Sequence, residues 1–89
     1  MFDWDQSNAQ HVMQHGVLPS DVEQAIDDPH ALATDAYDVA GERRFGLVGE
    51  TEDGRLLRVI YSWRGDRRRV VTAFPANARE QRRYEERRR

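Results

Sequence analysis

The chain has 89 residues, of which 38% are hydrophobic and 34% are charged, and it contains no cysteine. This length allows one domain with a modest core and excludes a two-domain cofactor enzyme. The missing cysteines exclude disulfides and thiolate metal sites. No apolar run approaches the roughly 20 residues that span a bilayer. We therefore expect a small soluble cytoplasmic protein with no membrane contact.

Charge is divided unevenly along the sequence. Residues 1–42 hold nine acidic residues and no arginine, whereas residues 43–89 hold fourteen arginines and seven acidic residues. Either the two halves neutralise each other in the fold, or the second half binds an anionic partner. Every cation of the second half is an arginine, which favours planar, bidentate recognition of phosphate or carboxylate.

Two short helices are predicted first. Asp5 is suited to cap a helix over residues 6–15. Ser20 is predicted as the N-cap of the next helix, with Glu23 as its capping-box partner. That helix ends before Pro29, because the residue preceding a proline disfavours helical geometry.

Strand-like segments follow, separated by turn signals at residues 52–54 and 64–66. The last segment leads into a helix over residues 77–88. Short turns between consecutive strands favour antiparallel pairing, so we expect an α+β fold. It has two N-terminal helices, a three- to four-stranded antiparallel sheet and a C-terminal helix. The predicted strands cover residues 31–37, 43–50, 55–63 and 67–74.

Metal and cofactor sites are disfavoured. His11 and His15 are four residues apart on one helix, a spacing that can bind zinc, but the HExxH pattern is absent. The sequence has no glycine-rich phosphate loop and no serine in a nucleophile-elbow context. We therefore predict no cofactor and no metal.

An arginine-rich hairpin makes RNA the best candidate ligand. Alternation along a strand predicts Arg67 and Arg69 on one face, and Arg68 on the other with Val70 and Thr72. RNA can be cleaved without a cofactor, because its 2′-hydroxyl can attack the neighbouring phosphate once protons are moved and the anionic centre is stabilised.

The candidate residues divide into a catalytic group and an RNA-binding group. Two of these assignments have structural alternatives: His15 could simply cap its helix, and the aromatic residues could pack in the core. The predicted catalytic residues are the proton carriers His15 and Glu42 with the phosphate clamps Arg67 and Arg69. The predicted RNA-binding residues are Arg43, Arg44, Arg64, Trp63 and Tyr84.

The sequence resembles the BrnT family of toxins from type II toxin–antitoxin systems. The matching pieces run in the family's order from Phe2 to Glu85, over nearly the whole chain. They are Phe2-x-Trp4-Asp5, Asn8, His15-Gly16-Val17, Asp28-Pro29, Glu42-Arg43-x-Phe45, Gly49, Asp53-Gly54-Arg55-Leu56-Leu57, Arg69-Val70-Val71-Thr72-Ala73, Pro75-Ala76-Asn77-Ala78-Arg79-Glu80 and Tyr84-Glu85.

This resemblance implies a single RelE-like toxin domain over residues 1–89. It implies a metal-independent ribonuclease that blocks translation. It also implies neutralisation by a BrnA-type antitoxin with a ribbon-helix-helix domain, and contact with operator DNA only through that antitoxin.

Two positions depart from the family pattern. The family commonly has lysine where this chain has Gln14, and arginine where it has Phe74. If both cations contact phosphate, this chain lacks two contacts worth about 1.5–3 kcal/mol each. One alternative is therefore a weakened or inactive domain of the same fold that only binds its antitoxin or nucleic acid. Another is a small interaction or nucleic-acid-binding domain unrelated to toxins.

Overall fold

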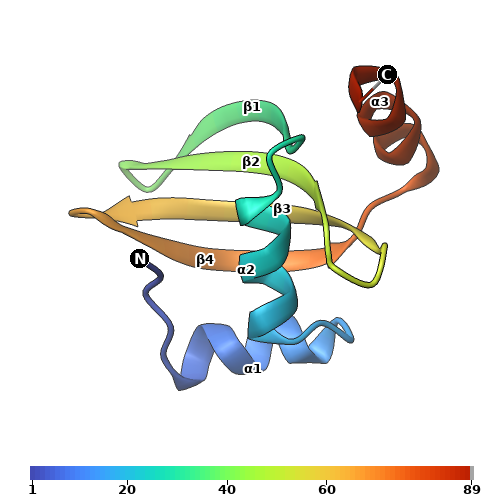
Figure 1. The fold of residues 1–89 in the computed structure, drawn as a ribbon. Helices are drawn as coiled ribbons and strands as arrows, with labels where there is room; N and C mark the ends of the chain where they lie inside the picture. Colours follow the sequence, from blue (N-terminus) through green and yellow to red (C-terminus); the bar gives the residue numbers. More distant parts are fainter. Residues whose placement is uncertain (89) are drawn as a thin grey trace.

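The protein is described by a computed structural model over residues 1–88. Two helices precede a four-stranded antiparallel sheet whose strand order follows the chain, and a third helix follows the sheet (Figure 1). This arrangement confirms the predicted α+β fold. The elements are α1 (Gln6–Gln14), α2 (Pro19–Asp27), β1 (Leu32–Val39), β2 (Glu42–Glu50), β3 (Leu56–Arg64), β4 (Arg67–Pro75) and α3 (Ala78–Arg88).

Local hydrogen bonds set where the first two helices begin. Asp5 caps α1 as predicted, because its carboxylate accepts from the Asn8 backbone N–H while the Asn8 side chain accepts from the Asp5 N–H. The prediction that Ser20 caps α2 is wrong. The N-cap is Leu18, two residues earlier, so the helix begins at Pro19, and the carboxylate of Asp21 accepts from the backbone N–H of Leu18. Proline suits this first helical position, where an N–H would have no partner.

The helices α1 and α2 supply the core on one face of the sheet, called here the helix face. Val12 of α1 and Val22 of α2 are fully buried against Leu57 and Val59 of β3. The approach of α2 is close, since a β-carbon at Gly49 would collide with the backbone of Ala25 in α2. Burial of each large side chain contributes about 1.5–3 kcal/mol.

The opposite face of the sheet, called here the cleft face, is covered at one end only. There Tyr84 of α3 packs against Val48 of β2, which is fully buried. The next residue along β2, Leu47, points to the opposite, helix face. In Figure 1 α3 stands at the far end of the sheet from the β3–β4 turn, while α1 runs along the outer edge of β4. The other end of the cleft face is left uncovered by helices.

A β-bulge at Val71 changes which side chains of β4 share a face. Tyr61 pairs with Val70 and the preceding Ile60 pairs with Thr72, so one extra residue lies in β4. Thr72 is therefore on the cleft face with Arg69, and the prediction that it shares a face with Arg68 and Val70 is wrong. Bulges re-aim side chains in this way, often beside functional sites.

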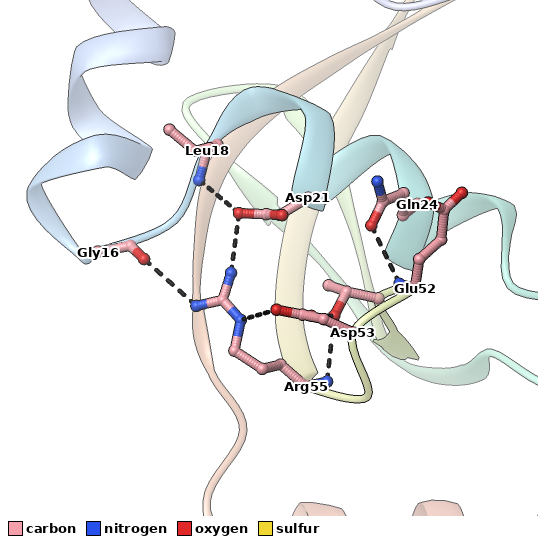
Figure 2. A network of polar contacts seen from close by, with 8 residues as sticks. Gly16, Leu18, Asp21, Gln24, Glu52, Asp53 and Arg55 are labelled. Carbon is pink, nitrogen blue, oxygen red and sulfur yellow. Dashed lines mark hydrogen bonds and ion pairs between the residues drawn. The ribbon is translucent and has the colours of Figure 1, made fainter.

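One arginine ties the β2–β3 turn to the junction of the first two helices (Figure 2). The Arg55 guanidinium donates to the Asp21 carboxylate at 2.8 Å and to the carbonyl oxygen of Gly16 at 3.3 Å. Its Nε lies 3.6 Å from the carboxylate of Asp53 in the same turn. We call these four residues the Arg55 clamp. It is one place where the basic half neutralises the acidic half.

Candidate nucleic-acid cleft

A cleft of about 290 Å³ lies at the uncovered end of the cleft face. Helix α1 forms one wall, and β2, β3 and β4 form the floor. Three arginines, one carboxylate and one imidazole converge on it. The lining residues are Ser7, Asn8, His11, Glu42, Arg44, Ser62, Arg64, Arg69, Val70 and Val71.

Sheet register brings these side chains together. Ser62 of β3 pairs directly with Arg69 of β4, and the β2–β3 ladder continues to place Arg44 on its other side. Residues opposite one another in antiparallel strands point to the same face, and alternate residues along each strand do so too. Glu42 and Arg64 therefore join this row from two positions farther along.

Two of the arginines share one carboxylate. Glu42 lies 3.4 Å from Arg44 and 3.8 Å from Arg64, and all three side chains are partly exposed to solvent. A single carboxylate neutralises only one guanidinium. This part of the cleft therefore keeps a net positive charge, which attracts a phosphate group.

The third arginine is held by the N-terminal segment. Arg69, whose side chain is 19% exposed, lies 2.9 Å from Asp5 and 3.7 Å from Asp3. The backbone N–H of Asn8 and the nearby Arg69 guanidinium hold the pKa of Asp5 below its usual value. Backbone hydrogen bonds between Asp3 and Arg68 and between Arg68 and Met1 fix the segment along β4. Arg69 thus orders the N-terminus as well as lining the cleft.

Ser62 has an unusual hydroxyl. The residue is 1% exposed, and within residues 1–88 its Oγ has no hydrogen-bond partner. A buried polar atom without a partner costs about 1–3 kcal/mol. Ser62 lines the cleft between arginines, with this hydroxyl buried beneath its floor.

His11 enters the cleft from α1, although it is not among the predicted catalytic or RNA-binding residues. Its Nε2 lies 3.1 Å from the hydroxyl of Thr72, which the bulge turns toward this side. The helical period could have indicated this position, because it places His11 on the side of α1 that also carries Ser7 and Asn8. His15, one turn later, lies outside the cleft lining, with its ring centroid 5.3 Å from that of His11.

The other predicted site residues are spread over the molecule. Arg67 pairs with Arg64 in the ladder and continues the arginine row toward the β3–β4 turn. Trp63 and Arg43 point to the helix face, because residues alternate between the two faces along each strand. There the Arg68 guanidinium lies 5.0 Å from the centre of the Trp63 ring, and Arg43 forms an ion pair with Asp38. The structure therefore brings together Glu42, Arg44, Arg64 and Arg69 of the nine predicted residues.

Tyr84 is far from this group. It is 1% exposed beneath α3, and its hydroxyl donates to the carboxylate of Asp28 at 2.5 Å. Burial, together with this carboxylate, raises the pKa of Tyr84 above its usual value. These contacts give Tyr84 a clear structural role in holding α3 to the end of α2.

A larger hollow of about 470 Å³ lies between α2 and the β2–β3 turn. Its charged lining is entirely acidic, so it repels the phosphates of RNA. Those carboxylates belong to Glu23, Asp27, Asp28, Glu50 and Glu52.

Residues 1–88 were considered for two other kinds of feature, a membrane-spanning helix and a metal site. No helix in this range has the length and apolar character needed to cross a membrane. In the same range, no three histidine, aspartate or glutamate side chains are grouped so as to hold a metal ion.

The sequence was also compared with known proteins. The family described as "Ribonuclease toxin, BrnT, of type II toxin-antitoxin system" matches residues 4–80, a range that contains every residue lining the cleft. No curated protein matches the chain. A family match over this much of the chain establishes membership. The chain therefore belongs to the BrnT family of ribonuclease toxins, and as the toxin of a type II system it has an antitoxin as its partner.

Proposed function

We propose that the protein cleaves RNA in the arginine-lined cleft, without a metal ion, and thereby inhibits translation. The observation that carries this proposal is the convergence of three arginines, Glu42 and His11 on one cleft. Arginines supply the positive charge that a phosphorane-like transition state needs. The reaction forms an O2′–P bond and breaks the P–O5′ bond, which leaves a 2′,3′-cyclic phosphate and a 5′-hydroxyl.

Phosphate binding is assigned to Arg44, Arg64 and Arg69. In the free protein Glu42 lies 3.4 Å from Arg44 and 3.8 Å from Arg64. The scissile phosphate replaces Glu42 as the partner of these two arginines. Each charge-assisted contact stabilises the transition state by about 1.5–3 kcal/mol. Arg67, next in the row, extends the cationic surface to a neighbouring phosphate.

Proton transfer is assigned to Glu42 and a histidine. Once phosphate takes its arginine partners, the Glu42 carboxylate accepts the proton of the 2′-hydroxyl. His11 is the imidazole that lines the cleft, and it donates a proton to the leaving 5′-oxygen. Positioned acid–base groups of this kind contribute about 10²- to 10⁴-fold in rate. The sequence predicted His15 as a proton carrier, and that role for His15 stays a prediction.

The partner assignments follow from the family resemblance. We propose a BrnA-type ribbon-helix-helix antitoxin, contact with operator DNA through that antitoxin, and action in the cytoplasm.

A second candidate function is a binding module of the same fold with weak or no cleavage. It is favoured by Gln14 and Phe74, which stand where the family commonly has cations. The carboxylates of Asp5 and Asp3 also occupy Arg69. Such a protein would bind its antitoxin without harming the cell.

Inducible expression of the chain alone in a bacterial host separates the two functions. Growth and bulk RNA integrity are followed together for the wild type, for Arg67→Ala and Arg69→Ala, and for Arg82→Ala on the exposed side of α3 as a matched arginine control. The ribonuclease proposal predicts growth arrest with RNA loss, weakened in the first two variants and kept in Arg82→Ala. Normal growth with soluble, folded protein and intact RNA would instead refute the ribonuclease and favour the binding module.

A further inference from the structure

Three aromatic rings form a row along the edge of the cleft face. His11 lies at the cleft, its ring centroid is 5.3 Å from that of His15, and the His15 ring is 5.9 Å from that of Phe74. We propose that His15 and Phe74 form a nucleobase-binding subsite, on which an unpaired RNA base stacks while its phosphate lies in the arginine cleft. The inference rests on the proposed function only for the position of that phosphate.

The fold aims Phe74 at this place without using it in the core. Because of the bulge at Val71, Phe74 is two residues beyond Thr72 on the cleft face and pairs with Arg58 of β3. It is half-buried, and it belongs to neither of the two hydrophobic clusters. A large aromatic ring outside both clusters is available for a ligand.

The His15 side chain is also unused by the fold. The predicted alternative was a helix cap, and the residue does cap α1, but through its backbone N–H, which donates to the carbonyl oxygen of Val12. Within residues 1–88 the ring nitrogens of His15 make no hydrogen bond, and its ring lies beside those of His11 and Phe74. The residue is exposed.

A base is the ligand that fits these properties. Aromatic side chains beside a cationic groove are the usual combination for unpaired nucleic acid, because every base has a π-face and every nucleotide a phosphate. His11 links the two parts here, since it lines the cleft and contacts His15. The subsite therefore selects single-stranded RNA and is tolerant of base identity.

The test measures binding separately from cleavage. Fluorescence anisotropy follows a short single-stranded 2′-O-methyl RNA, which lacks the attacking hydroxyl, and the same backbone with abasic residues. The variants are His15→Ala, His15→Phe, Phe74→Leu and Phe74→Tyr. His30→Ala, an exposed histidine after α2, is the matched control. Circular dichroism verifies that each variant is folded.

The subsite predicts that His15→Ala and Phe74→Leu each bind the base-bearing strand about tenfold more weakly, with unchanged binding of the abasic strand. His15→Phe and Phe74→Tyr keep the ring and retain binding. Equal loss on both strands, no loss on either, or no binding of the base-bearing strand by the wild type would overturn the subsite.

Cleavage of ordinary RNA by the same proteins tests the proposed function independently. Base-dependent binding without cleavage refutes the ribonuclease and keeps the subsite. Cleavage that is unaffected by loss of either ring refutes the subsite and keeps the ribonuclease. If His15→Phe binds normally but no longer cleaves, the stacking role is supported, and His15 also takes part in the proton transfer that is assigned here to His11.

Discussion

The Arg55 clamp and the cleft use the same side chain in opposite ways. In the clamp, one guanidinium meets two carboxylates, from Asp21 and Asp53. In the cleft, Arg44 and Arg64 share the single carboxylate of Glu42. The ratio of carboxylates to guanidinium groups decides whether an arginine stabilises the fold or keeps a positive charge that can bind phosphate. The number of arginines in a sequence does not decide this.

Arg69 belongs to both classes. It meets two carboxylates, as Arg55 does, yet it lines the cleft beside Ser62. Removing it disturbs the N-terminal segment as well as the cleft. Changes at Glu42, Arg64 and Arg55 therefore separate the two uses of arginine more cleanly than a change at Arg69.

The largest effect is expected for Glu42→Gln. The change removes the proposed base, so the single-turnover rate of RNA cleavage falls by about 10²- to 10⁴-fold. It also frees Arg44 and Arg64, so affinity for a non-cleavable RNA rises, as anisotropy would detect. Undiminished cleavage would exclude Glu42 from the proton transfer.

Arg64→Ala comes next. Loss of one charge-assisted phosphate contact, about 1.5–3 kcal/mol, lowers cleavage by roughly 10- to 100-fold. Its free energy of unfolding changes little, because the side chain is largely exposed. Arg82→Ala on α3 is the matched control. A fall in stability as large as that in activity would place Arg64 with the structural arginines.

Arg55→Ala should show the opposite pattern. It breaks contacts to Asp21, Asp53 and the Gly16 carbonyl, so the free energy of unfolding in urea falls by about 1–2 kcal/mol. Cleavage per folded molecule stays unchanged. The melting temperature falls by several degrees, as expected for a domain of this size. Lost cleavage in a folded Arg55→Ala protein would remove the distinction between the two regions.

The smallest effect is expected for Tyr84→Phe, which lowers the free energy of unfolding by about 1 kcal/mol near neutral pH. Although burial opposes it, hydrogen bonds from Tyr84 and the backbone N–H groups of His30 and Glu50 hold the pKa of Asp28 below its usual value. A lowered carboxyl pKa stabilises the fold above about pH 4 and loses that effect as pH falls through the folded value.

The wild-type advantage over Tyr84→Phe should therefore shrink in acid. The raised pKa of Tyr84 adds stability that is present below about pH 10 and lost at higher pH. Urea unfolding of both proteins across this range provides the measurement. A difference that stays constant from pH 3 to neutral would show that the contact with Asp28 does not depend on its ionisation.

Much of the fold was readable from local sequence signals. Caps, turn residues and strand composition placed all three helices and all four strands within a few residues of their observed ends. The start of α2 was misplaced because Ser20 and Glu23 fit a capping box, whereas Pro19 at the first helical position fits equally well and begins the helix.

The site was less readable, since it depends on pairing between strands. Alternation correctly separated Arg67 and Arg69 from Arg68. It failed beyond Val70, because Val-Val-Thr reads as an ordinary strand and nothing local marks Val71 as an extra residue. That one residue moves Thr72 and Phe74 to the cleft face. The place of His11 in the cleft depends on where α1 lies against β4, which local sequence does not specify.

Loss of cleavage on removal of the cleft arginines would show directly that the cleft is the site of RNA cleavage. We would measure single-turnover cleavage of single-stranded RNA in EDTA by the wild type, the Arg44→Ala/Arg64→Ala double variant and Arg55→Ala, each verified as folded. We expect metal-independent cleavage by the wild type and Arg55→Ala, and a loss of at least about 100-fold, the effect of two phosphate contacts, in the double variant. Equal cleavage by all three proteins would contradict this expectation.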